Sequence, residues 1–334
     1  MAVDAKQVHL AKSLAHTSPL INCRFDPSGQ YLFATAEDRA IIRWKLADGS
    51  KVIFKGHDSW VRGLAFSKDG KTLVTSGFDD TLIWWPMAAD KPEPIRKVTA
   101  HKGWIRAIAV SPDGALLASG GNDRVVKIWN TADGKPVAEL TGHELDVYSV
   151  MFHPDGKHLL SGDLMGHIRQ WDVAGAKEVR KFDAKDLHTY NSGQRVHFGG
   201  VRSLALTADR KQLIAGGLHK GTNPLGAVHE PIILRFEWDS QKVLKKHITT
   251  GVKGVIWRNV IHPDGFVMGC SGGSSGGYLI FWKAGEDKAF HKFKMQDTAR
   301  GMDLHPDGIQ VAAVHWNKKV SLCRLEEKSN SKKK

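Results

Sequence analysis

Residues 142–172 read GHELDVYSVMFHPDGKHLLSGDLMGHIRQWD, and this stretch contains every element of a unit that recurs along the chain. It begins with a Gly-His pair, ends with a Trp-Asp pair and contains a Pro-Asp-Gly turn at residues 154–156. Proline fixes φ and glycine adopts positive φ, so the turn is tight. The runs Val147–Phe152, His158–Ser161 and Ile168–Trp171 have the composition of short strands.

The same turn occurs seven times in the 334 residues. It ends at Gly29, Gly70, Gly114, Gly156, Arg210, Gly265 and Gly308, with spacings of 41, 44, 42, 54, 55 and 43 residues. In each of the first four units a tryptophan follows 15 residues after the end of the turn. A fourth strand-like run, such as Val137–Leu140, then precedes the next unit. Repetition of four short strands with a period of about 42 residues predicts an all-β repeat protein.

These features resemble the WD40-repeat family. The Gly-His pair is present at residues 56–57 and 142–143, and the Trp-Asp pair at residues 171–172. The resemblance covers nearly the whole chain. It implies a seven-bladed β-propeller, in which four-stranded antiparallel blades surround a central channel. We expect one propeller domain over residues 1–325 and a basic, disordered tail over residues 326–334.

The two ends of the repeat array predict how the ring closes. The last unit ends after its third strand, near Val320–Leu325, whereas one additional strand-like run, Val8–Ala15, precedes the first unit. We expect Val8–Ala15 to be the outer strand of the last blade, because this pairing removes an exposed sheet edge.

The resemblance also implies a buried polar network of Asp, His, Ser or Thr, and Trp within each blade. Two units contain the full set: His57, Thr75, Asp79 and Trp85, and then His101, Ser119, Asp123 and Trp129. A catalytic triad uses similar residue types. However, this set repeats with the unit, as an active site would not, so we interpret it as structural pairing of buried polar groups.

Other units depart from this set. The fourth has His143, Ser161 and Trp171, but Met165 occupies the expected Asp position. The first unit has an alanine at the hydroxyl position, beside Asp38 and Trp44, and we expect the network to be largely lost in the last three units.

One column of the repeat carries residues that this structural pattern does not require. In the family, the start of the innermost strand tends to face the top surface. Here this column reads Ile21, Arg62, Arg106, Tyr148, Arg202, Trp257 and Arg300, and it contains four of the 16 arginines of the chain. Trp60 and Trp104 lie two residues before two of these arginines. The guanidinium fork fits carboxylates and phosphates, and Trp, Tyr and Arg are enriched at binding hot spots. Pairing of each arginine with a loop carboxylate, such as Asp58, Asp123 or Asp146, is the alternative.

The two longest spacings arise from insertions around the fifth unit, at about residues 184–200 and 218–231. With a smaller extension at residues 272–277, they should form a rim on the same face as the arginine column. They contain His188, His197, His219, His229 and Glu230, but no pair has the spacing of a metal motif, so we expect no metal site. The GGSSG sequence within the smaller extension matches G-x-S-x-G only in its letters, because it lies between two strands and not at a strand-to-helix elbow.

Composition adds expectations about partners and compartment. The chain has 48 Lys and Arg against 35 Asp and Glu, a formal net charge of +13, which favours anionic partners. Three cysteines without CxxC spacing, Cys23, Cys270 and Cys323, argue against a disulfide framework and favour a reducing compartment. The first fifteen residues lack the apolar core of a signal peptide, and no run is long enough to span a membrane. We therefore expect a cytoplasmic protein without membrane insertion.

Together these features predict a monomeric, non-enzymatic interaction scaffold without cofactors or metals. It would bind an acidic or phosphorylated segment of another protein through Trp60, Arg62, Trp104, Arg106, Tyr148, Arg202, Trp257 and Arg300. The alternative is a nucleic-acid-binding propeller that uses the same basic face without reading bases. An enzyme built on the propeller has little support in the sequence.

Overall fold

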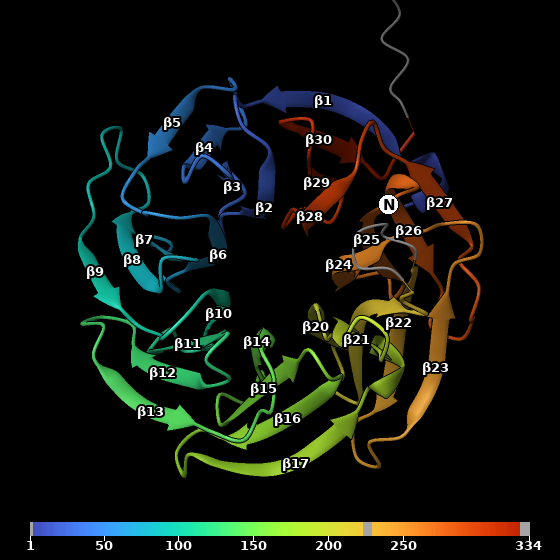
Figure 1. Cartoon of the computed structure of the whole chain (residues 1–334). Helices are drawn as coiled ribbons and strands as arrows, with labels where there is room; N and C mark the ends of the chain where they lie inside the picture. The colour runs from blue at the N-terminus through green and yellow to red at the C-terminus, as the bar shows by residue number, and fades with distance from the viewer. Residues whose placement is uncertain (1–2, 223–228, 328–334) are drawn as a thin grey trace, which may run out of the picture.

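The computed structural model describes residues 3–222 and 229–327 and is all-β. Seven four-stranded antiparallel sheets surround a central axis as the blades of a propeller, which confirms the predicted fold (Figure 1). Residues 223–228 of the second insertion and residues 328–334 of the predicted tail lie outside the described residues. In the part that is described, no helix is long and apolar enough to cross a membrane.

In the first four blades the chain runs from the inner strand to the outer strand. Blade one contains β2 (Leu20–Phe25), β3 (Tyr31–Ala36), β4 (Ile41–Lys45) and β5 (Lys51–Phe54). Blade two contains β6 (Val61–Phe66), β7 (Thr72–Gly77), β8 (Thr81–Pro86) and β9 (Arg96–Thr99). Blade three contains β10 (Ile105–Val110), β11 (Leu116–Gly121), β12 (Val126–Asn130) and β13 (Pro136–Leu140). Blade four contains β14 (Val147–Phe152), β15 (His158–Asp163), β16 (His167–Asp172) and β17 (Lys177–Asp183).

The remaining blades follow the same order around the ring. Blade five contains β20 (Ser203–Leu206), β21 (Gln212–His219), β22 (Glu230–Glu237) and β23 (Val243–Ile248). Blade six contains β24 (Val255–Ile261), β25 (Val267–Gly273), β26 (Gly276–Trp282) and β27 (His291–Lys294). Blade seven contains β28 (Ala299–Leu304), β29 (Gln310–His315), β30 (Lys319–Arg324) and β1 (His9–Ala15). Between blades four and five, β18 (His188–Asn191) and β19 (Val196–Gly199) form a separate hairpin.

The core lies between neighbouring blades. Each middle strand is buried on both faces, and its apolar side chains pack against the next blade. Phe33 of blade one is fully buried and contacts Phe54 of its own blade and Phe66 of blade two edge to face. Since each blade is buried against two neighbours, its second strand is buried along most of its length, as β3 and β7 are.

The ring closes as predicted. β1 pairs antiparallel with β30, from His9 opposite Arg324 to Ala15 opposite Lys319, and the two strands lie side by side at the junction of the chain ends (Figure 1). Leu14 of β1 belongs to the core between blades seven and one. The N-terminal strand therefore supplies the outer strand of the last blade.

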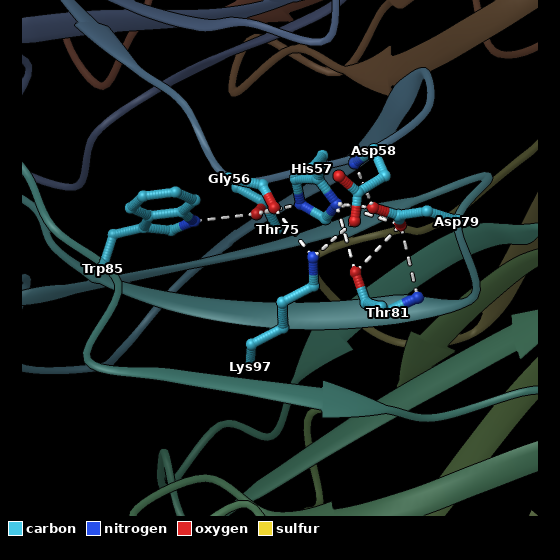
Figure 2. A network of polar contacts seen from close by, with 8 residues as sticks. All are labelled: Gly56, His57, Asp58, Thr75, Asp79, Thr81, Trp85 and Lys97. Atoms are coloured by element: carbon cyan, nitrogen blue, oxygen red, sulfur yellow. Dashed lines mark hydrogen bonds and ion pairs between the residues drawn. The ribbon is translucent and has the colours of Figure 1, made fainter.

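The predicted polar network of blade two is a continuous chain of contacts (Figure 2). The Nε1 of Trp85 donates to the Oγ1 of Thr75 over 2.9 Å. The same Oγ1 lies 2.7 Å from Nε2 of His57. The other ring nitrogen of His57 lies 3.0 Å from Asp79. Burial disfavours ionisation of Asp79, but its bonds with His57 and the Asp58 N–H outweigh this and hold its pKa below the usual range.

Blade three repeats this arrangement. His101 lies 2.9 Å from Asp123 and 2.7 Å from the Oγ of Ser119, to which Trp129 donates over 2.8 Å. The histidine and the hydroxyl are buried in both blades, and both are hydrogen-bonded within the network.

In blade four the expectation of a missing Asp is wrong. Asp163 lies 2.8 Å from Nδ1 of His143 and is fully buried, whereas Met165 is not part of the network. Asp163 is the last residue of β15, the place that Gly77 holds in β7. A Cβ built on Gly77 would lie 2.6 Å from Nδ1 of His57. A side chain at this position therefore points at the histidine. For this reason Asp163 contacts His143 although it lies two positions before Met165, where the repeat places its aspartate.

Blade one contains a member that the sequence analysis missed. His16 lies 2.8 Å from Asp38. Its Nδ1 is buried without a hydrogen-bond partner, and Ala34 stands at the position that carries the hydroxyl in blades two and three. The spacing of 22 residues between this histidine and its aspartate is the same as in blades two and three. This spacing is the feature of the sequence that identifies His16 as a network member.

Deletion of residues 1–15 should open the ring. Without β1, the edge of β30 is unpaired and the core around Leu14 is exposed, so we expect a lower melting temperature and self-association. Deletion of residues 328–334 is the control. A β1-deleted protein that remains monomeric in size-exclusion chromatography with an unchanged melting temperature would contradict this account of closure.

Replacement of Asp163 by alanine should destabilise the protein by about 1–3 kcal/mol, as expected when a buried hydrogen-bonded partner is removed. Asp123→Ala should have a similar effect, whereas Met165→Ala should have little. Denaturant unfolding of the three variants measures the difference. Equal effects of Asp163→Ala and Met165→Ala would show that the structural role of Asp163 is wrong.

Candidate binding site at the channel mouth

The predicted column comes together at one end of the central axis. All seven of its residues line a hollow of about 120 Å³, and Trp60 and Phe78 complete the wall. The lining residues are Ile21, Trp60, Arg62, Phe78, Arg106, Tyr148, Arg202, Trp257 and Arg300. The structure thus brings together every predicted partner-binding residue except Trp104. This hollow is called the channel mouth below.

A β-bulge places these side chains at the mouth. In six inner strands the register shifts by one residue, and the column residue is the one left without a partner, as Arg62 is between Val61 and Gly63. The same shift occurs at Ile21, Arg106, Tyr148, Trp257 and Arg300. A bulge bends the strand and changes the direction of its side chain. Arg202 directly precedes β20 and occupies the equivalent place in blade five.

Trp104 lies beside the mouth. Its ring stacks on Phe78 with a centroid distance of 4.4 Å and an interplanar angle of 4°. Trp60 contacts the same phenylalanine at 6.1 Å. Trp60 and Trp104 remain 40% and 45% exposed, so these three residues form an aromatic surface at the edge of the hollow.

Guanidinium and aromatic groups alternate across the axis. Arg202 lies between Tyr148 and Trp257, with its Cζ 3.8 Å and 5.5 Å from the two ring centroids. The Cζ of Arg106 lies 4.4 Å from the ring centroid of the same tyrosine, and the Cζ of Arg62 lies 5.4 Å from that of Trp257. Because Arg62 belongs to blade two and Trp257 to blade six, this last contact crosses the channel. These five residues are called the arginine–aromatic layer below.

Only some of the arginines have carboxylate partners. Arg106 lies 3.3 Å from Asp146, and Arg300 pairs with Glu37 of blade one at 2.6 Å. For these two the alternative of loop pairing holds, although Glu37 was not foreseen.

Arg62 and Arg202 differ from this pair. Within the described residues neither has a carboxylate within salt-bridge distance, and Nε of Arg202 is buried without a hydrogen-bond partner. Arg62 donates one bond, to the carbonyl of Ile21, at 3.2 Å.

Burial and mutual repulsion act on these unpaired cations. Burial, followed by the charges of Arg202, Arg300 and Arg106, lowers the pKa of Arg62 to about 9. Burial also lowers the pKa of Arg202. Arginine side chains stay protonated at neutral pH, so the folded protein holds like charges together at the mouth. An anion placed between them would relieve that repulsion.

The first insertion supports the mouth from behind. Phe198 of the β18–β19 hairpin, Leu218 of β21 and Val255 of β24 form a small buried cluster against which Trp257 packs. Gly200 has φ +93°, and a Cβ there would lie 3.0 Å from Tyr148, so the backbone can approach the ring only without a side chain. The insertion therefore fixes two aromatic members of the layer.

The histidines of the insertions form local contacts. His188 lies 2.9 Å from His197, and His219 lies 3.3 Å from Glu230. Burial lowers the pKa of His188, His219 and His229, which favours their neutral forms at neutral pH. The smaller extension is a tight hairpin between β25 and β26, with Ser274 and Ser275 at its turn.

One group in the described residues has the ligand types and proximity of a metal site: His153, Asp155 and His158, at the β14–β15 turn. The same His-x-Asp contact occurs at His305 and Asp307 in blade seven, where no second histidine is present. The pair therefore belongs to the repeated turn, in which Nδ1 of the histidine accepts a hydrogen bond from the N–H of the aspartate.

Replacing Arg62 and Arg202 by glutamine should leave the melting temperature of the ligand-free protein unchanged or raise it. The lowered pKa of Arg62 means that the folded state disfavours its charged form. The resulting loss of folding free energy is fully present at neutral pH and decreases above about pH 9. Added salt should stabilise the wild type more than this variant. Arg39→Gln with Arg210→Gln, two exposed arginines, is the control for net charge. A marked fall in melting temperature for the mouth variant would refute the repulsion.

Comparisons with known proteins agree with this architecture. The family described as WD domain, G-beta repeat matches residues 8–45, 49–86, 92–130 and 134–172. Each match contains the outer strand of one blade and the first three strands of the next, which is the offset that lets β1 close the ring.

Individual relatives match over short segments. An uncharacterized WD repeat-containing protein of Schizosaccharomyces pombe is 34% identical over 79 residues, 23% of this chain and 20% of that protein. Protein hir1 of the same species is 27% identical over 137 residues, covering 35% and 14%. DDB1- and CUL4-associated factor 10 of Xenopus laevis is 37% identical over 76 residues, covering 22% and 16%. The matched segments thus span 20% or less of these relatives. The four matched repeats, these relatives and the seven blades show that the chain belongs to the WD40-repeat family.

Proposed function

We propose that this protein is a monomeric, cytoplasmic interaction scaffold that binds an acidic or phosphorylated segment of another protein at the channel mouth. The observation that carries the proposal is the state of Arg62 and Arg202, which line the hollow without carboxylate partners. Guanidinium groups form strong, often bidentate hydrogen bonds with carboxylates and phosphates. An anionic side chain from a partner would supply the missing acceptors.

The size of the mouth indicates how the partner is held. A hollow of about 120 Å³ accommodates one acidic side chain or phosphoryl group, not a whole segment. Around it, Trp60, Trp104 and Trp316 are 40%, 45% and 53% exposed and offer flat apolar surfaces for flanking residues. Exposed aromatic residues next to arginine are typical of binding hot spots.

The chemistry of the mouth supports a scaffold and not an enzyme. Its described lining contains no Ser, Cys, His, Asp or Glu, and its one hydroxyl-bearing residue, Tyr148, contacts Arg106 and Arg202. The His, Asp and hydroxyl sets of blades two to four are buried and bonded to one another inside the blades. The relative named DDB1- and CUL4-associated factor is, by that name, a protein that associates with others.

Cysteine chemistry agrees with the proposed compartment. Cys23, Cys270 and Cys323 are all buried and free. Burial raises the pKa of Cys323 to about 12, so its thiol stays protonated and unreactive at neutral pH. Free, buried thiols are expected in a reducing compartment.

Nucleic-acid binding is the second candidate. The net charge of +13 and the exposed Trp60 and Trp104, on which bases stack, favour it. The two candidates differ in how they depend on arginine geometry and on salt.

Arg62→Ala with Arg202→Ala should weaken binding of a phosphoserine-containing acidic peptide by about tenfold or more, since each charge-assisted bond is worth roughly 1.5–3 kcal/mol. The corresponding lysine variant keeps the charge but loses the fork, so its affinity should also fall. Fluorescence anisotropy with a labelled peptide measures both.

The control is Arg39→Ala with Arg210→Ala, which removes the same charge elsewhere and should bind normally. Retention of affinity in the lysine variant, with a steep linear decrease of log affinity for single-stranded DNA against log salt, would favour the nucleic-acid candidate. Equal peptide binding by the wild type and the mouth alanine variant would refute the proposed site.

A further inference from the structure

A second and larger cavity lies on the other side of the arginine–aromatic layer. It has a volume of about 470 Å³ and continues along the inner strands to Pro27 at the β2–β3 turn. Arg62, Arg106, Tyr148, Arg202 and Trp257 line both this cavity and the mouth. The layer is therefore the floor of the mouth and the roof of the larger space, which is called the channel cavity below.

The wall of the channel cavity is strongly cationic. Five arginines line it, Arg24 and Arg258 in addition to three from the layer, and the described lining contains no Asp, Glu or Lys. Like charges that converge in a partly buried space repel one another. Five arginines in one wall without an acidic residue are therefore unusual.

Few carboxylates reach these arginines from behind the wall. Arg258 lies 3.4 Å from Asp303, and its Nε is buried without a partner. Arg24 donates to the carbonyl of Cys23 over 2.8 Å and has no carboxylate within salt-bridge distance among the described residues. Burial, then repulsion by Arg24, lowers the pKa of Arg258 to about 10. Three guanidinium groups, those of Arg24, Arg62 and Arg202, thus face this space without a compensating charge.

The dimensions of the cavity favour a small molecule over a protein segment. Sites for small ligands typically measure about 300–1,000 Å³. The contact of Arg62 with Trp257 crosses the axis between the mouth and the cavity, so a segment held at the mouth is separated from the space beneath. Most of the remaining lining side chains are apolar, including Leu64, Ile108 and Val150, so the arginines are the charged groups that an anionic ligand would meet.

We propose that the channel cavity binds a small polyanion with two or more linked phosphoryl groups. Arg24 and Arg258 hold one phosphoryl group and the layer arginines Arg62 and Arg202 hold another. A chain of phosphoryl groups presents several acceptors in a small volume, and guanidinium forks match their geometry. This site is additional to the proposed protein-binding function and does not require it, although the two share Arg62 and Arg202.

Inorganic tripolyphosphate is the probe, titrated into the full-length protein by isothermal titration calorimetry, with orthophosphate for comparison. We expect one site per chain and binding of tripolyphosphate that is tighter than that of orthophosphate by about tenfold or more, since more charge-assisted bonds form. A variant with Arg24→Gln and Arg258→Gln, which alters no residue of the mouth, should lose at least a similar factor. The melting temperature of the wild type should rise on addition of tripolyphosphate, and that of the variant should not.

Two controls separate this site from the mouth. Trp60→Ala with Trp104→Ala alters only the mouth region and should weaken binding of the acidic peptide while leaving tripolyphosphate binding intact. Arg39→Gln with Arg210→Gln lowers the net charge equally and should change neither. If the glutamine variant of Arg24 and Arg258 does not fold, Arg24→Lys keeps the charge and should still weaken tripolyphosphate binding.

The outcomes are distinct. Loss of tripolyphosphate binding in the Trp60 and Trp104 variant, with unchanged binding in the Arg24 and Arg258 variant, would place the polyanion at the mouth and overturn the channel site. Equal binding by all variants, or no binding by the wild type, would overturn it as well.

Discussion

The hydrogen-bonded pairing of β1 with β30 is the constraint on which the rest of the molecule depends. Each blade contributes its column residue to the channel mouth, so the mouth exists only when all seven inner strands are held around one axis (Figure 1). The layer residues come from five different blades, and the Arg300–Glu37 pair joins blades seven and one across the closure. Opening the ring at β1 would therefore disperse the site as well as expose an edge.

Closure has to withstand a force that the site itself creates. Arg24, Arg62, Arg202 and Arg258 repel one another at the axis, and each would be more stable farther apart. The interblade cores and the buried networks of blades one to four act in the opposite direction, because they hold the strands of each blade together. Figure 2 shows the network of blade two. The cation–aromatic contacts offset part of the repulsion where the arginines stand between rings. Charged residues that destabilise the folded chain are typical of functional positions, and the arginines without carboxylate partners at the axis are of this kind.

The sequence predicted the repeating architecture well and the details of the site less well. The turn and tryptophan spacings are local, so they revealed the seven blades, the closing strand and the arginine column. Asp163 was missed because a residue two positions earlier in the chain reaches the same histidine from the end of β15, which a fixed motif offset does not describe. His16 was missed because it directly follows the closing strand β1, and because Ala34 at the hydroxyl position leaves blade one without the full set of residue types. Glu37 was missed because its partner is 263 residues away and is its neighbour only once the ring has closed.

The central claim is that Arg62 and Arg202 remain unpaired within the protein and bind anions at the axis. A crystal structure of the full chain soaked with tungstate, whose anomalous signal locates the anion, tests it most directly. The account predicts an anomalous peak on the axis within hydrogen-bonding distance of both guanidinium groups, beside Tyr148 and Trp257. A structure in which these two arginines pair with blade carboxylates, and in which the axis holds no anion, would contradict it.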